Sequence, residues 1–340
     1  KGAKIVTQTR CVSAKRENGI WVVELENEQG RYQIQAKVLV NAAGPWVAQF
    51  IKQDLKLKSQ YGIRLIQGSH IIVPKIYEGD KAFIMQNDDQ RIVFAIPYLD
   101  KYTMIGTTDR EYTGDPNQVE ITQAEIEYLL DVANDHFKKT LQQDDIIQTF
   151  SGVRPLCDDE SDNPAAITRD YTLVLLKDEE NEAPLLSVFG GKLTTYRKLA
   201  ESAMEHLKKF FPEMAKPWTE KALLPGAENL GSIDDLILEI QNKIKGLDAE
   251  TANRWARAYG TCVWNFVQYA TSVHELGQHF GHGLYAQEVD YLVDAEWATT
   301  SVDILKRRTK LYLELTQDEV QSLDVYLLEL HQRRMQKEVA

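Results

Sequence analysis

The chain has 340 residues, 43% hydrophobic and 26% charged, a composition that excludes disordered, collagen-like and coiled-coil proteins. Acidic residues outnumber basic residues 51 to 39, and the resulting net charge of −12 argues against general binding to nucleic acid. No apolar run reaches the ~18 residues typical of a transmembrane helix. The three cysteines, Cys11, Cys157 and Cys262, form neither a disulfide framework nor a zinc spacing, which favours a reducing cytosol.

The first part of the chain alternates strand and turn signals. Residues 4–13 and 20–26 are predicted strands joined at Asn18-Gly19, because this dipeptide supplies the positive φ values of a tight hairpin. Residues 82–86 and 91–96 form a second predicted hairpin, followed by a strand over residues 102–105. Thr122 and Glu125 have the spacing of a capping box, so a helix is predicted to follow them. Short apolar strands are predicted over residues 172–177 and 185–189.

The last third of the chain is predicted to be helical. All ten prolines lie at or before Pro225, and proline is the residue that most strongly disrupts helix interiors. Apolar residues beyond residue 290 recur at steps of three and four. About five or six helices are expected between residues 232 and 337, given a mean helix length of ~11–12 residues.

The first candidate functional motif runs from Lys37 to Trp46. A buried strand leads through Asn41, two alanines and Gly44 into a helix with Pro45 in its first turn. Small residues at such a turn allow a ligand to approach the backbone closely. An ordinary connection between a strand and a helix explains the same pattern.

The second motif runs from Leu186 to Lys198. A strand ends at Gly190-Gly191, and Lys192, Thr194 and Thr195 open a helix, whose N-terminus suits a phosphate or an electron-rich ring. The glycines and the lysine do not have the spacing of a P-loop. The alternative interpretation is an ordinary capped helix with basic side chains on its surface.

Arg154 lies between Val153 and Pro155, so its position is expected to be fixed by its neighbours. Its planar fork of donors suits a carboxylate or a phosphate. A structural ion pair with Asp158, Asp159 or Glu160 is the alternative.

His70 stands at the start of an apolar strand and is a candidate general base, expected to titrate at roughly pH 6 to 7.5. A hydrogen-bonded core histidine is the alternative. His274 and His279 lie five residues apart, one more than the HExxH motif of zinc enzymes, so no metal site is predicted from them or from His282.

Together these motifs resemble one family, the FAD-dependent respiratory glycerol-3-phosphate dehydrogenases. The resemblance rests on VNAAGPWV at residues 40–47, YGIRLIQGSH at 61–70, IGTTD at 105–109, SGVRPLCDDESDNPAAITRDY at 151–171 and FGGKLTTYRKLAE at 189–201. Members of this family begin with a strand, a glycine-rich loop and a helix that bind the FAD pyrophosphate. No such motif occurs near this N-terminus. The chain is therefore expected to be a C-terminal portion, cut inside the flavin domain, that binds FAD weakly or not at all by itself.

The resemblance implies an α+β fold with three kinds of domain. Residues 1–50 and 183–224 would be parts of an FAD-binding domain of the glutathione-reductase or amino-acid-oxidase type. Residues 51–182 would form an antiparallel substrate-binding sheet, and residues 225–340 an all-helical C-terminal domain.

The resemblance also implies oxidation of sn-glycerol 3-phosphate to dihydroxyacetone phosphate, with electrons passing through FAD to a membrane quinone. His70 and Arg154 would be catalytic, and Arg154, Arg169 and Lys192 would bind the substrate. The implied FAD-binding residues are Asn41, Ala42, Gly44, Pro45, Trp46, Gly190, Gly191, Lys192, Leu193, Thr194 and Thr195.

The implied location is the cytoplasmic face of a bacterial inner membrane, with peripheral attachment and a possible homodimer. Three alternatives stay open: a glycerophosphate oxidase, another flavin oxidase of amines or hydroxy acids, and a non-catalytic folded module.

Overall fold

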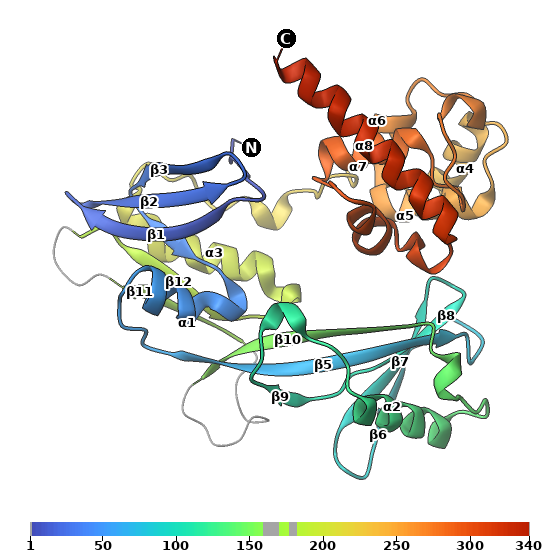
Figure 1. Cartoon of the computed structure of the whole chain (residues 1–340), viewed down its shortest axis with the longest axis horizontal. Helices are drawn as coiled ribbons and strands as arrows, with labels where there is room; N and C mark the ends of the chain where they lie inside the picture. Colours follow the sequence, from blue (N-terminus) through green and yellow to red (C-terminus); the bar gives the residue numbers. More distant parts are fainter. Residues whose placement is uncertain (1, 159–169, 177–181, 340) are drawn as a thin grey trace. The chain divides into compact units, whose positions relative to one another are not determined.

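The structure, a computed structural model, describes residues 2–158, 170–176 and 182–339. Figure 1 shows the chain coloured from its N-terminus to its C-terminus. It divides into two compact units, Lys1–Glu220 and Lys221–Ala340, and each unit is built around its own hydrophobic core. The first unit combines sheets and helices, whereas the described part of the second contains helices and no strand longer than an isolated bridge. The expected α+β class with a helical C-terminal part is confirmed.

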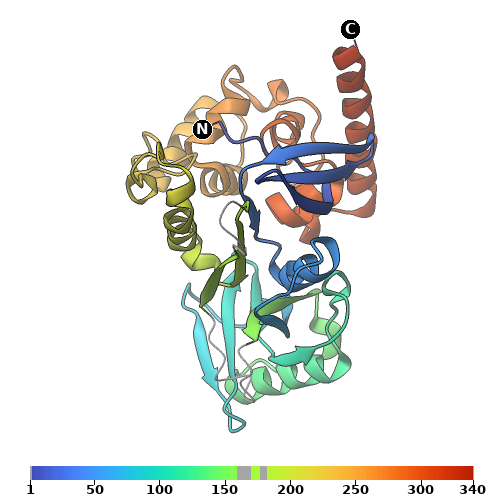
Figure 2. The ribbon, with the colours of Figure 1, turned by 90° about the vertical axis from the view of Figure 1, so that its left-hand side faces the viewer.

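The first unit opens with an antiparallel meander of three strands, β1 (Arg10–Glu17), β2 (Ile20–Asn27) and β3 (Gly30–Ala36), seen in dark blue in Figure 2. The predicted hairpin is confirmed, because Asn18 and Gly19 both adopt positive φ values, of 51° and 78°. The first strand begins at Arg10, six residues later than expected, since residues 4–9 have no partner strand.

A small second sheet has the strand order β11–β12–β4. Strand β4 (Leu39–Asn41) runs parallel to β12 (Leu185–Gly190), and β11 (Tyr171–Leu176) runs antiparallel to β12. Residues 44–54 follow β4 as short helical turns: η1 (Gly44–Trp46), α1 (Val47–Gln49) and η2 (Phe50–Asp54). The turn η5 (Leu193–Thr195) and helix α3 (Tyr196–Leu207) follow β12 in the same way.

The largest sheet has the order β10–β5–β8–β7–β6, with β9 paired to one end of β5. Its strands are β5 (Gly62–Pro74), β6 (Phe83–Gln86), β7 (Ile92–Tyr98), β8 (Tyr102–Gly106), β9 (Arg110–Tyr112) and β10 (Gln148–Asp158). Figure 1 shows β5 and β10 as two long neighbouring strands. The predicted second hairpin is confirmed as β6 and β7.

Helix α2 (Gln123–His136) covers one face of this sheet and contacts β5, β7 and β8. The predicted capping box is present, since Thr122 and Glu125 exchange hydrogen bonds between side chain and backbone. Leu129 and Ala133 pack against Ile71 and Ile105 in a buried cluster. The side chains on the other face of the sheet alternate with these along each strand.

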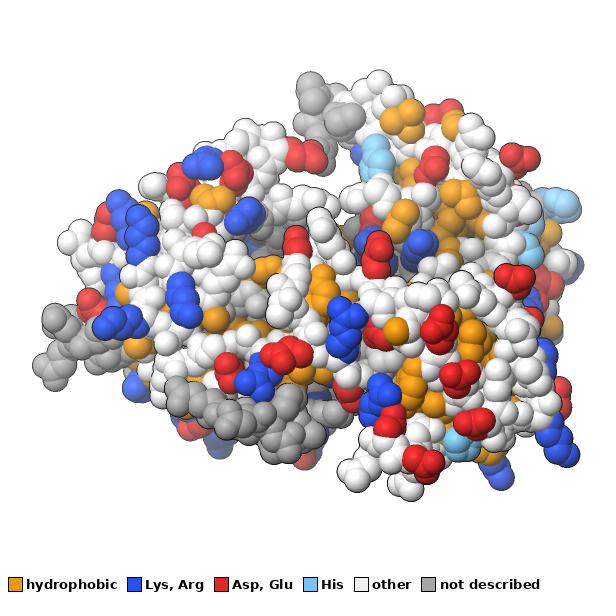
Figure 3. All heavy atoms as spheres, turned by 60° about the horizontal axis from the view of Figure 1, so that its bottom comes forward, with side chains coloured by type: hydrophobic (Ala, Val, Ile, Leu, Met, Phe, Trp, Pro, Cys, Tyr) orange, Lys and Arg blue, Asp and Glu red, His pale blue; other side chains and the backbone are white. Residues whose placement is uncertain are grey.

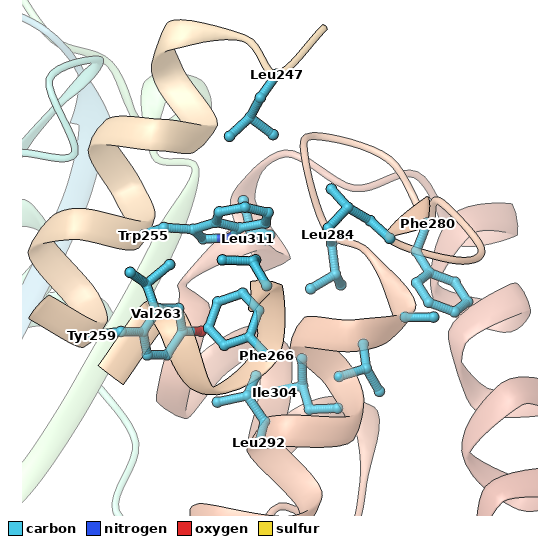
Figure 4. Close-up of a cluster of buried hydrophobic side chains, with 14 of the residues drawn as sticks. Leu247, Trp255, Tyr259, Val263, Phe266, Phe280, Leu284, Leu292, Ile304 and Leu311 are labelled. Carbon is cyan, nitrogen blue, oxygen red and sulfur yellow. The ribbon is translucent and has the colours of Figure 1, made fainter. Parts of the chain in front are cut away.

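The second unit packs its helices around a continuous core, of which Figure 4 shows a part. The ring of Phe266 meets those of Trp255 and Tyr259 edge to face, with centroids 5.2 Å and 5.3 Å apart. The helices are α4 (Ile233–Lys243), α5 (Ala249–Tyr259), α6 (Trp264–Val267), α7 (Ala286–Ala295), η10 (Asp303–Thr309) and α8 (Gln317–Val339). Three short turns accompany them: η8 (Gly260–Val263), η9 (Val273–Glu275) and η11 (Leu311–Leu313). A further short turn, η7 (Thr219–Lys221), lies at the boundary between the units.

A fully buried carboxylate, Glu288, lies inside this core. It accepts hydrogen bonds from Arg254 Nη2 at 2.8 Å, from Trp255 Nε1 at 2.8 Å and from Tyr259 Oη at 2.6 Å. Burial, followed by the charge of Glu288, raises the pKa of Tyr259 well above its ordinary value. The network therefore fixes α5 against α7, because an unpaired charge at this depth is strongly unfavourable.

On the face in Figure 3, basic and acidic side chains are interspersed, and hydrophobic side chains show between them. Among the described helices, none is both long and apolar enough to cross a bilayer.

Candidate active site

The two motifs rich in small residues meet at one edge of the small sheet. Leu39 pairs with Leu185 and Asn41 with Ser187 in parallel register, so both strands deliver the chain to the same side. Ligands of α/β proteins bind beyond the carboxyl ends of parallel strands, where the chain leaves the sheet. The sequence alone did not show that these segments, about 150 residues apart, are neighbours.

Asn41 is buried and organises the turn after β4. Its amide nitrogen donates to the carbonyl of Val47 at 2.9 Å, and its oxygen accepts from the backbone of Ala43 at 3.3 Å. Gly44 has a φ of +56°, and an added Cβ there would meet no atom within 4 Å. The backbone at Gly44 is thus open to a ligand, and Asn41 acts as its support.

The surroundings of this turn also leave room. Ala42 and Trp46 are exposed. Together with Asn41 and the meander they line a hollow of about 1060 Å³.

Gly190 and Gly191 have φ values of +69° and +108°, which only glycine adopts without strain. A Cβ on Gly190 would lie 3.5 Å from the carbonyl oxygen of Pro155, which places this turn next to β10. Lys192, Leu193 and Thr194 are exposed beyond it. The η1 turn contacts both β10 and β12, so the first motif, the second motif and the strand that carries Arg154 converge.

His70 lies on the face of the large sheet that α2 does not cover. It pairs with Phe150 on β10 and Gly106 on β8, and its ring stacks on Phe150 with centroids 4.8 Å apart. The ring lies directly over Gly106, where an added Cβ would come within 2.3 Å of it. Nδ1 is buried and has no hydrogen-bond partner in the described part of the chain, which leaves Nε2 for a ligand.

Burial and the positive charge of Arg154 lower the pKa of His70 to about 4. This value is below the range of 6 to 7.5 expected from the sequence. The difference has a physical cause, since desolvation disfavours the charged imidazolium and a neighbouring cation adds to that effect. The ring is therefore neutral, and able to accept a proton, throughout the physiological pH range.

Arg154 lies on the same face of the sheet, four residue pairs further along. It pairs with Ile66 on β5, and its guanidinium reaches back over Gly68, where an added Cβ would be 2.8 Å from Nη2. Gly68 precedes His70 by two residues on β5, so the position over which the guanidinium lies is about 7 Å along the strand from His70. The three glycines at positions 68, 106 and 152 keep this face flat.

Within the described part of the chain, two acceptors hold the guanidinium of Arg154. Nη1 bonds to the carboxylate of Asp109, and Nη2 donates to Thr107 Oγ1 at 3.2 Å. The sequence-based alternative named Asp158, Asp159 or Glu160 as the partner. Asp158 instead lies 3.8 Å from Arg64, and Asp159 and Glu160 are outside the described residues.

Most residues predicted from the sequence thus fall into two groups. Asn41–Trp46 and Gly190–Thr195 flank the edge of the small sheet, while His70 and Arg154 share an open sheet face. Arg169 lies outside the described residues. Thr107 and Asp109 were missed as site residues, although IGTTD directly follows a predicted strand and carries both.

Two histidines of the second unit, His279 and His282, contact other residues of that unit. His279 accepts from the backbone of Gly283 at 3.2 Å and stacks on Tyr285, and His282 lies 3.8 Å from Glu314. Among the described residues, no cluster of histidine, cysteine and carboxylate side chains is arranged to hold a metal ion.

The residues present fit the ring end of a flavin. A planar ligand can lie against the flat face at Gly152, where an added Cβ would meet nothing within 4 Å, and it can approach the backbone at Gly44. At Gly190 and Gly191 an added Cβ would instead come within 3.1 Å of the protein's own atoms, so this turn packs closely against its neighbours. The two openings, at Gly44 and Gly152, lie on segments that contact each other through η1 and β10.

Two family models match the chain. Residues 1–197 match the family described as FAD dependent oxidoreductase, and residues 217–334 match the C-terminal domain of alpha-glycerophosphate oxidase. A solved structure with similar fold is the glycerol-3-phosphate dehydrogenase from Bacillus halodurans complexed with FAD. It is 27% identical with a TM-score of 0.75, and the match covers 98% of this chain and 65% of that one.

Curated relatives between 50% and 58% identical carry the name glycerol-3-phosphate dehydrogenase. The relative from Pseudomonas aeruginosa is 58% identical over 98% of this chain and 65% of its own length. A protein of Brucella abortus named D-erythritol 1-phosphate dehydrogenase is 44% identical over 94% of this chain and 64% of its own length. The chain thus spans slightly less than two thirds of the length of the relative from Pseudomonas aeruginosa. On these matches, the chain belongs to the FAD-dependent glycerol-3-phosphate dehydrogenase family of FAD dependent oxidoreductases.

Proposed function

We propose that the protein containing this chain oxidises sn-glycerol 3-phosphate to dihydroxyacetone phosphate. The names of the relatives support this substrate. The structural observation that carries the proposal is the shared sheet face, on which a neutral imidazole and a guanidinium lie over same-face positions of β5 that are roughly 7 Å apart along the strand, beside an open surface at Gly152. Oxidation of a secondary alcohol that bears a phosphate needs a proton acceptor and an anion-binding group in one site.

His70 is the proposed general base. It takes the proton of the C2 hydroxyl on Nε2, because Nδ1 is buried. FAD, when bound, would supply the acceptor for the hydride that leaves C2 as the C2–H bond breaks. Stacking on Phe150 and contact with Gly106 hold the ring in one orientation while it accepts the proton. A base whose pKa is near 4 is weak but is fully in its active form at neutral pH.

Arg154 is the proposed partner for negative charge. Its fork can hold the substrate phosphate or stabilise the oxygen at C2 as the proton leaves. Thr107 and Asp109 orient it, so its direction is set before the substrate binds. Lys192 and Arg169 are proposed to add positive charge for the same phosphate.

The FAD site is proposed to include Asn41, Ala42, Gly44, Pro45 and Trp46 on one side. Gly190, Gly191, Lys192, Leu193, Thr194 and Thr195 are proposed for the other side. Support comes from the parallel register of β4 and β12, which delivers both segments to one edge. The four-segment domain division expected from the sequence remains part of this proposal.

We also propose that the electrons pass to a membrane quinone. The protein would then attach peripherally to the cytoplasmic face of a bacterial inner membrane, and a homodimer is possible. This part rests on the family resemblance. Sedimentation of the protein with quinone-containing vesicles, together with reduction of a quinone analogue rather than oxygen, tests it.

The substrate is tested by anaerobic reduction of the protein's flavin. sn-Glycerol 3-phosphate should reduce it faster than either D-erythritol 1-phosphate or unphosphorylated glycerol. Faster reduction by D-erythritol 1-phosphate, the compound named in the Brucella relative, would reassign the substrate. Reaction with oxygen as efficient as with quinone analogues would favour an oxidase.

A further inference from the structure

Glu125 is a buried carboxylate at the start of α2, on the opposite side of the large sheet from the proposed active site. A capping box needs only the exchange with Thr122, whose backbone N–H donates to Glu125 at 2.9 Å. Glu125 accepts three further bonds from outside its own helix. They come from Thr108 Oγ1 at 2.6 Å, Ser69 Oγ at 2.9 Å and Gln67 Nε2 at 3.2 Å.

Thr108 connects this carboxylate to Arg154. The ladder between β5 and β8 ends at His70 and Gly106, so the residues that follow leave the regular sheet. Thr108 returns them to β5, because its hydroxyl accepts from the backbone of Ser69 at 3.0 Å and donates to Glu125. Its two chain neighbours, Thr107 and Asp109, are the acceptors that hold Arg154.

Ser69 connects the same carboxylate to His70. Ser69 directly precedes His70, and its hydroxyl also accepts from Ser151 Oγ at 2.9 Å. Ser151 follows Phe150, on which the His70 ring stacks. Glu125 is therefore bonded through the Ser69 hydroxyl to the strand that carries the proposed base, and through the Thr108 hydroxyl to the loop whose residues hold Arg154.

We propose that Glu125 is a positioning residue that holds Arg154, through Thr108, and His70, through Ser69, in their reactive geometry. This inference rests on the proposed function. Hydrogen bonds to an ionised acceptor are shorter and stronger than those to a neutral acceptor, so a carboxylate suits this task better than an amide. Burial alone would raise the pKa of Glu125, but the bonds from Thr108, Thr122 and Ser69 outweigh it, and its pKa lies below the ordinary value.

The competing explanation is that Glu125 only caps α2 and stabilises the fold. Two variants separate the explanations. Glu125→Gln keeps the volume but replaces one acceptor oxygen with a donor that faces other donors. Thr122→Ala weakens the cap but leaves Thr108 and Ser69 bonded to the carboxylate, so it is the matched control.

The test uses the complete flavin-containing protein. Glu125→Gln should lower kcat/KM for sn-glycerol 3-phosphate at least tenfold at unchanged FAD content. Thr122→Ala should lower the melting temperature and keep kcat/KM within twofold of wild type. In an Arg154→Ala background, Glu125→Gln should lower kcat/KM by a smaller factor than in wild type, because the part that acts through the guanidinium is already lost and only the part that acts through His70 remains.

Thr108→Val supplies a second variant if Glu125→Gln does not fold, since it cuts the link to the loop and spares the cap. It should lower kcat/KM at least fivefold. The inference is overturned if either folded variant stays within twofold of wild type, or if the losses from Glu125→Gln and Arg154→Ala multiply.

Binding of inorganic phosphate, measured by calorimetry, separates failure of this inference from failure of the proposed function. If wild type does not oxidise glycerol 3-phosphate, the proposed function fails. Weaker phosphate binding in Glu125→Gln and in Arg154→Ala than in wild type would still support the link between Glu125 and Arg154. Equal phosphate binding in Glu125→Gln and wild type would overturn it.

Discussion

At the scale of single residues, the proposed chemistry depends on side chains whose properties come from their neighbours. Arginine is usually exposed and mobile, but Asp109 and Thr107 hold the guanidinium of Arg154 in one orientation. His70 is an ordinary histidine whose burial and cationic neighbour keep it neutral. Both features are created by strands that pair across long stretches of sequence.

Arg154→Ala is expected to remove most activity toward glycerol 3-phosphate. Loss of a charge-assisted contact costs about 1.5–3 kcal/mol, which corresponds to ~10- to 150-fold in kcat/KM. Arg154→Lys should recover only part of this, because an ammonium cannot replace both bonds of the fork. Steady-state kinetics on the three proteins decide the matter, and wild-type kcat/KM in Arg154→Ala would remove this residue from the site.

His70 sets the expected pH dependence. Since its folded pKa is about 4 and its ordinary value 6.5, the rate of flavin reduction should stay level from pH 7 down to about 5 and fall as the pH approaches 4. By the same shift, His70 favours the folded state above about pH 6.5, and this contribution is lost as the pH falls from 6.5 through 4.

Single-turnover reduction measured across this pH range is the test, and a break near pH 6.5 would contradict the buried, neutral ring. His70→Asn should lower turnover by ~10²–10⁴ while FAD content is unchanged. If His70 only packs the sheet, the same variant should instead have a lower melting temperature and near-normal flavin reduction.

At the scale of secondary-structure elements, the open face of the large sheet is the decisive feature. The faces of β5, β8 and β10 differ because side chains alternate along each strand: one face packs on α2 and the other carries His70, Arg154 and three glycines. A flat surface of this kind accommodates a planar ring. Glycine is required at positions 106 and 68 because the side chains of His70 and Arg154 already occupy the space above them.

Gly106→Ala tests this surface. An added Cβ would lie 2.3 Å from the His70 ring, so the ring or the strand must move, at a cost of ~1–3 kcal/mol. We expect lower thermal stability and slower flavin reduction. Gly152→Ala is the matched variant, because its Cβ meets nothing within 4 Å.

Gly152→Ala should keep wild-type thermal stability without ligand. If a ligand ring covers this face, as proposed, it should bind FAD or substrate less tightly. Wild-type stability and activity in Gly106→Ala would show that the contact with His70 is tolerated.

At the scale of the whole molecule, the chain consists of two units with separate cores. The second unit buries a large apolar cluster and pairs its internal charge, Glu288, with Arg254. Residues 221–340 expressed alone are therefore expected to unfold cooperatively in urea. Glu288→Gln in this unit should cost ~3–5 kcal/mol, because it leaves the guanidinium of Arg254 buried without its counter-charge. Non-cooperative unfolding of residues 221–340 would mean that their core depends on the first unit.

The 340 residues by themselves are expected to copurify with little FAD. The residues proposed for the FAD site would contact the ring end of a flavin, whereas the sequence contains no glycine-rich loop of the dinucleotide-binding type after a strand near its start. Such a loop supplies backbone N–H groups and a helix dipole to the pyrophosphate. Flavin absorbance of the purified chain is the measurement, and one FAD per chain would show the expectation to be wrong.

Local signals in the sequence determined many of the elements. Asn18-Gly19 predicted its hairpin because these residues tolerate positive φ, and Thr122 with Glu125 predicted the start of α2 because a cap needs only four consecutive residues. The absence of proline after Pro225 predicted the helical unit. The motifs at Asn41–Trp46 and Gly190–Thr195 carried the resemblance to the family, which the comparisons confirm.

The tertiary structure decided what these residues touch. Asp109 holds Arg154 from 45 residues away, and Glu125 reaches Ser69 from 56 residues away, which no local pattern reveals. The low pKa of His70 likewise arises from burial between three strands and from Arg154. Backbone conformation depends on residues that are close in the sequence, so local patterns predict it. The contacts between distant side chains and the desolvation of His70 depend on strand register, which exists only once the sheet has formed.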